Sequence, residues 1–283
     1  MRNNLASLTH RHFSDAAVGH MTANATLRFF HSLRQVETLR TAMVLVMAGL
    51  LAGCAVPQKV SQQTTQGTQP NSWDSLAISR WEQMQLPNKV PTLYALDHES
   101  PPNPQGLRSA VRARADASAS MLHTHLSIQP EDLRQVHFSW LVPALIQDAD
   151  LATRQGDDSP VRLVLAFEGD RANFSAKDAA LNELTRLVTG KEMPYATLMY
   201  VWCNKRPVGT IVHSARTDRV RKIVIESGAL GLHQWRDYQR DIRADFEAAF
   251  GEAPGKLVGI GIMTDSDNTQ SRTQAWYGKI SLQ

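Results

Sequence analysis

The chain has 283 residues, of which 42% are apolar, and this fits one folded domain with extensions rather than a collagen-like or plainly disordered chain. Its formal charge of +3 comes from residues 1–53, which hold five Arg against Asp15 and Glu37. The rest carries 25 basic and 25 acidic side chains. A domain with equal numbers of basic and acidic side chains lacks the clustered Lys and Arg that bind phosphate backbones, so we expect no nucleic-acid partner.

Residues 41–52, TAMVLVMAGLLA, form an apolar run after Arg34 and Arg40. The run is shorter than the roughly 20 residues that a membrane span needs, which is typical of a signal h-region. The following LAGC resembles a lipobox, so we expect residues 1–53 to be a leader and Cys54 to be lipidated. The alternative is a buried core segment that ends in an ordinary cysteine.

Ala55 follows the cysteine where an acidic residue would favour retention at the inner membrane. We therefore expect a lipid-anchored protein of the outer membrane, facing the periplasm. Met21 offers a second start that leaves a leader of ordinary length.

Residues 54–72 are rich in Gln, Thr and Ser and predict a flexible tether, and residues 73–283 predict a single domain. With Cys54 consumed by lipid, no intramolecular disulfide is expected. Cys203 lies in the apolar run YVWC and is interpreted as a buried small residue rather than a nucleophile.

Short runs rich in β-branched and aromatic residues recur along this domain and end at Gly, Pro, Asp or Asn. Their number and irregular connections predict a mainly β fold, a two-sheet antiparallel sandwich with two short flanking helices. The runs are TLYAL, LRSAVRAR, SMLHTHLSI, VHFSWLV, VRLVLAF, TLMYVWC, KIVIES, LVGIGIM and QAWYGKISL. In VHFSWLV, alternation places Val136, Phe138, Trp140 and Val142 on one face, which we expect to be core.

Two helices are predicted between the strands. Ser175 with Asp178 forms a capping pattern before helically spaced leucines, and Gly190 offers a C-terminal stop. The second covers residues 241–250 and ends at Gly251.

The nucleophile elbow, zinc-protease, paired C-x-x-C, Walker and dinucleotide motifs are absent from the sequence. His123 and His125 share a strand face and would ligate zinc given a third ligand, although a solvated polar face explains them as well.

Carboxylates cluster at two predicted strand ends. Asp157 and Asp158 precede the strand that carries Arg162, and this group would bind calcium or sugar hydroxyls, or form a salt-bridged turn. Asp265 and Asp267, with Asn268, follow LVGIGIM. They suit calcium only weakly, because the EF-hand spacing fails, and a capped turn explains them equally.

Other polar and aromatic side chains are candidates for the same rim. Glu226 in IESG ends a predicted strand, with turn formation as its alternative role. Trp202, Trp235, Trp276 and Tyr277 would offer a stacking surface for sugars, although aromatic residues in a sandwich are more often core.

The ordered set SWLV, DLATRQGDDSPVR, YVW, IESG, W-x4-R, DF-x3-FG, GIGIMTDSDNTQ and AWYGKI resembles the bacterial family filed as domain of unknown function 3047, over residues 73–283. The resemblance implies a galactose-binding-like jelly roll and no particular activity. The residues at its motif positions are Asp157, Asp158, Arg162, Glu226, Trp235, Arg240, Asp265, Asp267 and Asn268.

Three functions remain open on the sequence. The first is a non-catalytic module that binds a glycan or another envelope component at the rim. The second is a hydrolase of an envelope polymer with two rim carboxylates as acid and base. The third is a structural assembly lipoprotein whose rim is a protein interface. No cofactor is expected beyond the calcium considered above.

Overall fold

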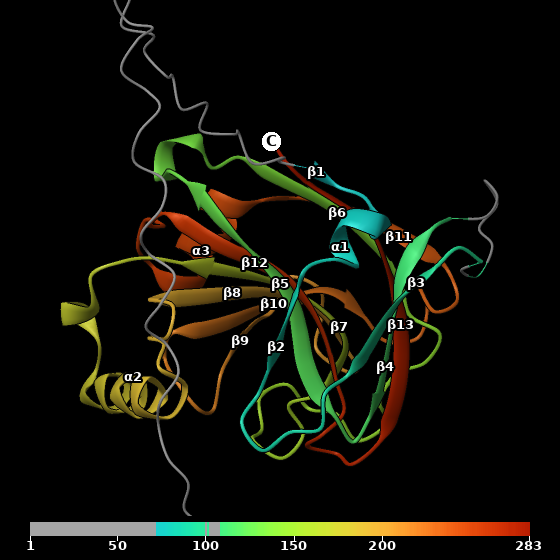
Figure 1. The fold of residues 1–283 in the computed structure, drawn as a ribbon, viewed down its shortest axis with the longest axis horizontal. Coiled ribbons are helices and arrows are strands. Elements are labelled where there is room, and N and C mark those ends of the chain that lie inside the picture. Colours follow the sequence, from blue (N-terminus) through green and yellow to red (C-terminus); the bar gives the residue numbers. More distant parts are fainter. Residues whose placement is uncertain (1–71, 100, 102–107) are drawn as a thin grey trace, which may run out of the picture. The chain divides into compact units, whose positions relative to one another are not determined.

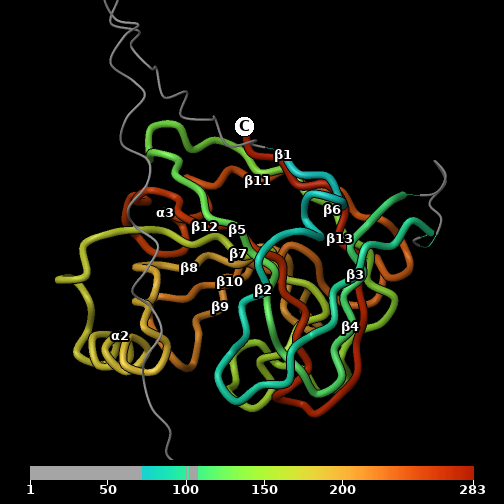
Figure 2. Tube along the Cα trace, in the orientation of Figure 1, coloured from blue at the N-terminus to red at the C-terminus, as the bar shows by residue number. Residues whose placement is uncertain are grey.

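The computed structural model describes residues 72–99, 101 and 108–283, and the expected leader, most of the tether and Cys54 lie outside this range. Within it, thirteen strands form two sheets that face each other across an apolar core (Figures 1 and 2). The predicted two-sheet β-sandwich is confirmed.

The six-stranded sheet has the order β11, β6, β13, β4, β3, and β1 also pairs with β13. Its strands are β1 (Ser72–Trp73), β3 (Leu93–Asp97), β4 (Ala110–Asp116), β6 (Gln135–Leu141), β11 (Trp235–Asp241) and β13 (Arg272–Leu282).

The seven-stranded sheet has the order β2, β5, β12, β7, β8, β10, β9. Its strands are β2 (Glu82–Gln85), β5 (Ala119–Ile128), β7 (Ser159–Phe167), β8 (Ala196–Cys203), β9 (Ile211–His213), β10 (Val220–Ser227) and β12 (Leu257–Asp265). One pair departs from the expected antiparallel pattern, because β8 and β10 run parallel. The chain between them forms β9, which pairs antiparallel with β10 at the sheet edge.

The core lies between the inner faces of the sheets. Phe138, Trp140 and Tyr200 are fully or almost fully buried there, and the Phe138 ring stacks on that of Tyr200 at 5.6 Å. Val136 and Val142 share this burial, so the face predicted from VHFSWLV is the core face.

Both predicted helices form, and a short third one precedes β2. They are α1 (Ser75–Ile78), α2 (Ala176–Thr189) and α3 (Ile242–Phe250), accompanied by 3-10 turns at Pro130–Asp132 and Arg171–Asn173. Ser175 caps α2 and Asp241 caps α3, while Gly190 and Gly251 end them in the left-handed conformation. No helix in the described part of the chain has the length and hydropathy of a membrane span.

The two long helices differ in how they contact the sandwich. α3 buries Ile242 and Phe246 in the main core. In α2, Asp178 is the one buried residue, and Leu184, Leu187 and Val188 are exposed. These three apolar side chains of α2 are therefore not covered by the sandwich.

Candidate functional site

Two of the predicted carboxylates meet Arg162 at the end of the seven-stranded sheet. Arg162 on β7 donates Nε to Asp265 Oδ1 at 2.8 Å and Nη2 to Asp265 Oδ2 at 2.9 Å, which is a bidentate pair. The same guanidinium donates to Asp157 Oδ1 at 3.2 Å. Lys222 of β10 donates to Asp157 Oδ2 at 2.6 Å. We call Asp157, Arg162, Lys222 and Asp265 the buried ion cluster.

This cluster alternates two cations with two carboxylates and is withdrawn from solvent. Arg162 is 2% exposed, Lys222 1% and Asp265 3%. Lys222 also donates to the backbone oxygen of Leu151 at 2.8 Å, so the loop before β7 is fastened over the cluster. A buried charge is tolerated only when it is paired and hydrogen-bonded, and this condition is met here.

The pKa values of the cluster's side chains reflect the opposing effects of burial and ion pairing. Burial alone would raise the pKa of Asp157, but Arg162 and Lys222 outweigh it and hold that pKa below its usual range. Burial raises the pKa of Asp265 to about 6, although Arg162 opposes the rise. Burial and the neighbouring Arg162 lower the pKa of Lys222. At neutral pH Asp265 is thus ionised and pairs with Arg162.

Asp158 fastens the loop that follows β12. It is 1% exposed and accepts hydrogen bonds from the backbone N–H groups of Asn268 at 3.1 Å and Thr269 at 2.7 Å. The Asn268 amide and the Thr269 hydroxyl donate to it as well, at 2.8 and 2.6 Å. The two predicted acidic loops therefore come together, and Asp158 acts as a cap of the second loop.

Asp158, Asp265 and Asp267 bring carboxylate oxygens within 4.8 Å of one another, which is the spacing that calcium would use. The oxygens are already engaged, because Arg162 holds Asp265 and Lys89 pairs with Asp267. A cation would have to displace these donors. The set therefore fits a calcium ion poorly, and the contacts favour the structural interpretation of these acids over ligand contact.

Glu226 and Arg240 lie apart from this cluster, along the side where β11 faces β10. Glu226 accepts from the Tyr238 hydroxyl at 2.9 Å and from Arg236 Nε at 3.1 Å. Arg240 Nε donates to Asp245 at 2.9 Å, and Tyr200 donates to the same carboxylate at 2.8 Å. One Arg–carboxylate–Tyr group thus connects β11 with β10, and the other connects β11 with α3 and β8.

The four candidate aromatic residues divide into two pairs. Trp202 and Tyr277 are in the main core, where the Tyr277 hydroxyl donates to the backbone oxygen of Met263 at 2.6 Å. Trp235 and Trp276 lie on the outer face of the six-stranded sheet, where both pack with Leu141. Leu141 pairs with Trp235 on one side and with Trp276 on the other.

Charged and polar side chains surround these two tryptophans. Trp276 Nε1 donates to Asp97 at 2.9 Å, and Arg112 lies 3.6 Å from the same carboxylate. The Arg108 guanidinium lies 4.8 Å from the Trp235 ring centroid and donates to Asp237 at 3.0 Å. We call this surface the tryptophan face; it consists of Asp97, Arg108, Arg112, Trp235, Asp237 and Trp276.

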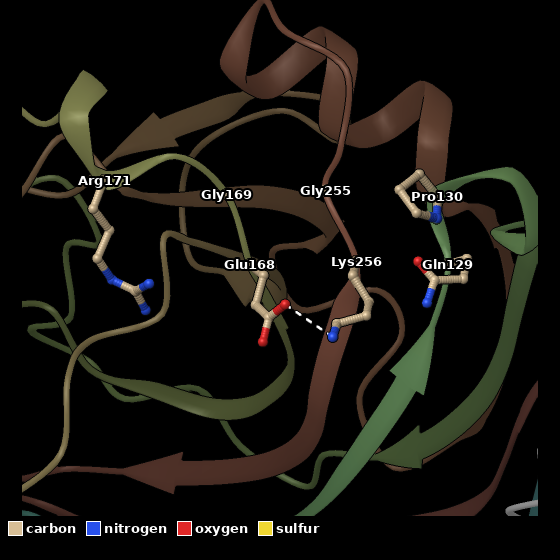
Figure 3. A pocket seen from close by; sticks show the side chains of 7 residues that line it. All are labelled: Gln129, Pro130, Glu168, Gly169, Arg171, Gly255 and Lys256. Carbon is tan, nitrogen blue, oxygen red and sulfur yellow. Dashed lines mark ion pairs between the residues drawn. The ribbon is translucent and has the colours of Figure 1, made fainter.

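A shallow cavity of about 430 Å³ opens at the other end of the seven-stranded sheet (Figure 3). Glu168 and Lys256 point toward each other across it and pair at 3.0 Å. Gly255 is required there, because a Cβ would lie 2.0 Å from the backbone oxygen of Glu168. Glu168 is the one carboxylate that lines this cavity, whereas acid–base glycoside hydrolysis needs two.

His123 and His125 lie side by side on β5, with ring centroids 5.3 Å apart. His123 Nε2 is 3.9 Å from Glu82 of the neighbouring strand, and burial lowers the pKa of His123. Among the described residues, the histidines do not join a set of three His, Cys, Asp or Glu ligands at metal spacing. Cys203 is a free, buried thiol packed with Val201 and Val224.

Sequence reasoning missed both lysines that neutralise the acidic loops. Lys222 lies in the strand VRKIVIES, and a lysine within such an apolar strand indicates a buried carboxylate partner. The sequence could therefore have pointed to Lys222. Lys89 lies far from Asp267 in the sequence and in a polar turn, so nothing in the sequence linked the two.

Comparison with known proteins supplies the family. Residues 79–281 match the family described as "Protein of unknown function (DUF3047)". No curated protein matches the chain in sequence.

Solved structures offer remote likenesses. The glycoside hydrolase domain of Endo-D from Streptococcus pneumoniae R6 has 8% identity and a TM-score of 0.30; the match covers 72% of this chain and 21% of that one. The xyloglucanase domain of NopAA from Sinorhizobium fredii, solved with cellobiose, has 8% identity and a TM-score of 0.32, over 75% of this chain and 97% of that one. Winged bean acidic lectin with methyl-α-D-galactose has 9% identity and a TM-score of 0.30, over 75% and 98%.

The match to the family spans most of the chain and includes the buried ion cluster, the loop capped by Asp158 and the tryptophan face, so this chain is a member of the DUF3047 family.

Proposed function

We propose that this chain is a lipid-anchored protein of the bacterial cell envelope whose sandwich is a non-catalytic module that binds a glycan. The observation that supports the binding proposal is the tryptophan face, where the half-buried Trp235 ring lies beside the exposed Asp237. Trp235 packs there on the buried Leu141 and Trp276, which are 1% and 7% exposed.

The chemistry of the face suits a saccharide. A sugar presents an apolar C–H face and a rim of hydroxyl groups, so it is bound by an aromatic ring beside planar polar side chains. Trp235 supplies a half-buried ring, and Asp237 an exposed carboxylate next to it. The acids of the buried ion cluster are withdrawn from solvent, whereas Trp235 and Asp237 are accessible. The proposed ligand surface is therefore centred on these two side chains and not on the rim expected from the sequence.

The location part of the proposal rests on the sequence. The apolar run at residues 41–52, the LAGC motif and the polar stretch after Cys54 support export, lipidation at Cys54 and a tether to the outer membrane. Multiple acyl chains bind a bilayer firmly, since each buried methylene contributes about 0.8 kcal/mol.

An array of bacterial envelope saccharides probed with the purified chain tests the binding proposal. We expect saturable binding that Trp235→Ala abolishes and Trp235→Phe partly retains, because phenylalanine keeps a stacking ring. Leu230→Ala, at a side chain that is 95% exposed and belongs to a loop, is the matched control and should bind as the wild type does. Absence of saturable binding to every saccharide, or equal binding by Trp235→Ala, would refute the proposal.

A further inference from the structure

A row of three methionines crosses the outer face of the seven-stranded sheet. Met84 on β2 pairs with Met121 on β5, and Met121 pairs with Met263 on β12. Residues directly opposite each other in adjacent strands point to the same side, with Cβ atoms about 4.5–5.5 Å apart. The neighbours Leu122 and Ile262 point into the core, so the methionines point outward, and all three are half-buried.

Each of the next two rows of the same face carries an imidazole group. His123 pairs with Gly261, and His125 pairs with Gly259. Because glycine has no side chain, the strand position beside each histidine leaves room for a neighbouring side chain, and His123 itself is only 6% exposed. The thioether of Met121 occupies part of this space, since a Cβ at Gly261 would lie 2.7 Å from Met121 Sδ. The sulfur is therefore placed over the strand position directly opposite His123.

These groups form a ligand set of a particular chemical class. Thioether sulfur selects soft metal ions, above all Cu(I), and imidazole binds copper well, whereas Ca²⁺ and Mg²⁺ require oxygen ligands. Cys203, the one cysteine among the described residues, lies farther along the sheet in the cluster with Leu151 and Val212 and is not part of this surface.

We propose that Met84, Met121, Met263 and His123 form a binding site for one Cu(I) ion, in which Met121 and His123 are the central ligands. The site is separate from the tryptophan face, which belongs to the other sheet, and it does not depend on glycan binding. A metal at this position would join β2, β5 and β12 and thereby secure the short edge strand β2.

Anaerobic competition with a chromogenic Cu(I) chelator, in ascorbate, measures the site on the purified full chain. We expect the wild type to withdraw one equivalent of Cu(I). Met121→Leu and His123→Gln should each weaken the affinity at least tenfold. Met193→Leu and His213→Gln, which replace the same residue types elsewhere, are matched controls and should bind as the wild type does. X-ray absorption of the loaded protein should show both sulfur and nitrogen ligands.

Leucine conserves the volume of methionine, so Met121→Leu should retain the fold, and this is checked by thermal unfolding without metal. The proposal is overturned if the wild type withdraws no copper, which would make the methionines packing groups only. It is also overturned if the two control variants lose as much affinity as the site variants, or if the absorption spectrum shows oxygen ligands alone.

Discussion

Arg162 and Asp265 form a two-point ion pair between β7 and β12, with both side chains almost completely buried. The pair joins the two acidic loops that the sequence singled out. Removal of one partner would leave an uncompensated charge in the interior, whereas removal of both would not.

Asp265→Asn should therefore lower the free energy of unfolding by about 3–5 kcal/mol. The double variant Arg162→Met with Asp265→Leu should recover a large part of this loss, because two apolar side chains need no charge partner. Urea unfolding measures both. Arg272→Gln, which breaks an exposed pair with Asp116, is the control and should change little. A double variant less stable than Asp265→Asn would show that the charges themselves stabilise the fold.

The stability that Asp157 contributes should depend on pH. Arg162 and Lys222 hold its pKa below the ordinary value of 3.8, so the folded chain releases this proton at a lower pH than the unfolded chain. The contribution is therefore complete above pH 3.8 and is lost as the pH falls through the lowered pKa.

Urea unfolding of the wild type and Asp157→Asn at several pH values tests this. Between pH 7 and pH 5 the neighbouring Asp265, with its pKa of about 6, also titrates, so the test is made at lower pH. There the difference between their free energies of unfolding should shrink as the pH falls through the lowered pKa of Asp157. A difference that grows in acid would mean that burial, which raises the pKa, outweighs the two cations.

Gly255→Ala should destabilise the end of the seven-stranded sheet, because the added Cβ would lie 2.0 Å from the backbone oxygen of Glu168. Overpacking of this kind costs about 1–3 kcal/mol. Gly259→Ala is a suitable control, since its Cβ would meet Ala166 at an ordinary 3.5 Å. Equal melting temperatures for the two variants would contradict the close approach.

Lipidation at Cys54 is directly measurable. Mass spectrometry of the membrane fraction should find residues 1–53 absent and a diacylglyceryl group on Cys54. Cys54→Ser should leave the protein unprocessed and without the lipid. A free thiol at Cys54 in material from the native host would contradict the anchor.

The number of strand-length runs and their irregular connections predicted the sandwich. VHFSWLV and VRLVLAF became β6 and β7 nearly residue for residue. The strand β11 was missed because WRDYQRD lies at a sheet edge and keeps most side chains in water. Alternation also says nothing about strand direction, so the parallel pairing of β8 with β10 was not predictable.

The sequence predicted which residues come together at the candidate site better than it predicted what those residues do. Asp157, Arg162 and Asp265 meet, as the expectation of a common rim required. Their burial depends on Lys222 and on the loop around Leu151, which are distant in sequence. The choice between ligand contact and internal pairing is therefore a property of the tertiary structure.

Hydrogen exchange, compared between the saccharide-bound and the unbound chain, shows where on the sandwich the saccharide binds. We expect slower exchange in β11 and β13 around Trp235 and Trp276, and unchanged exchange in the segments around Asp157 and Asp267. Slower exchange confined to those two acidic loops would contradict this expectation and return the ligand to the rim.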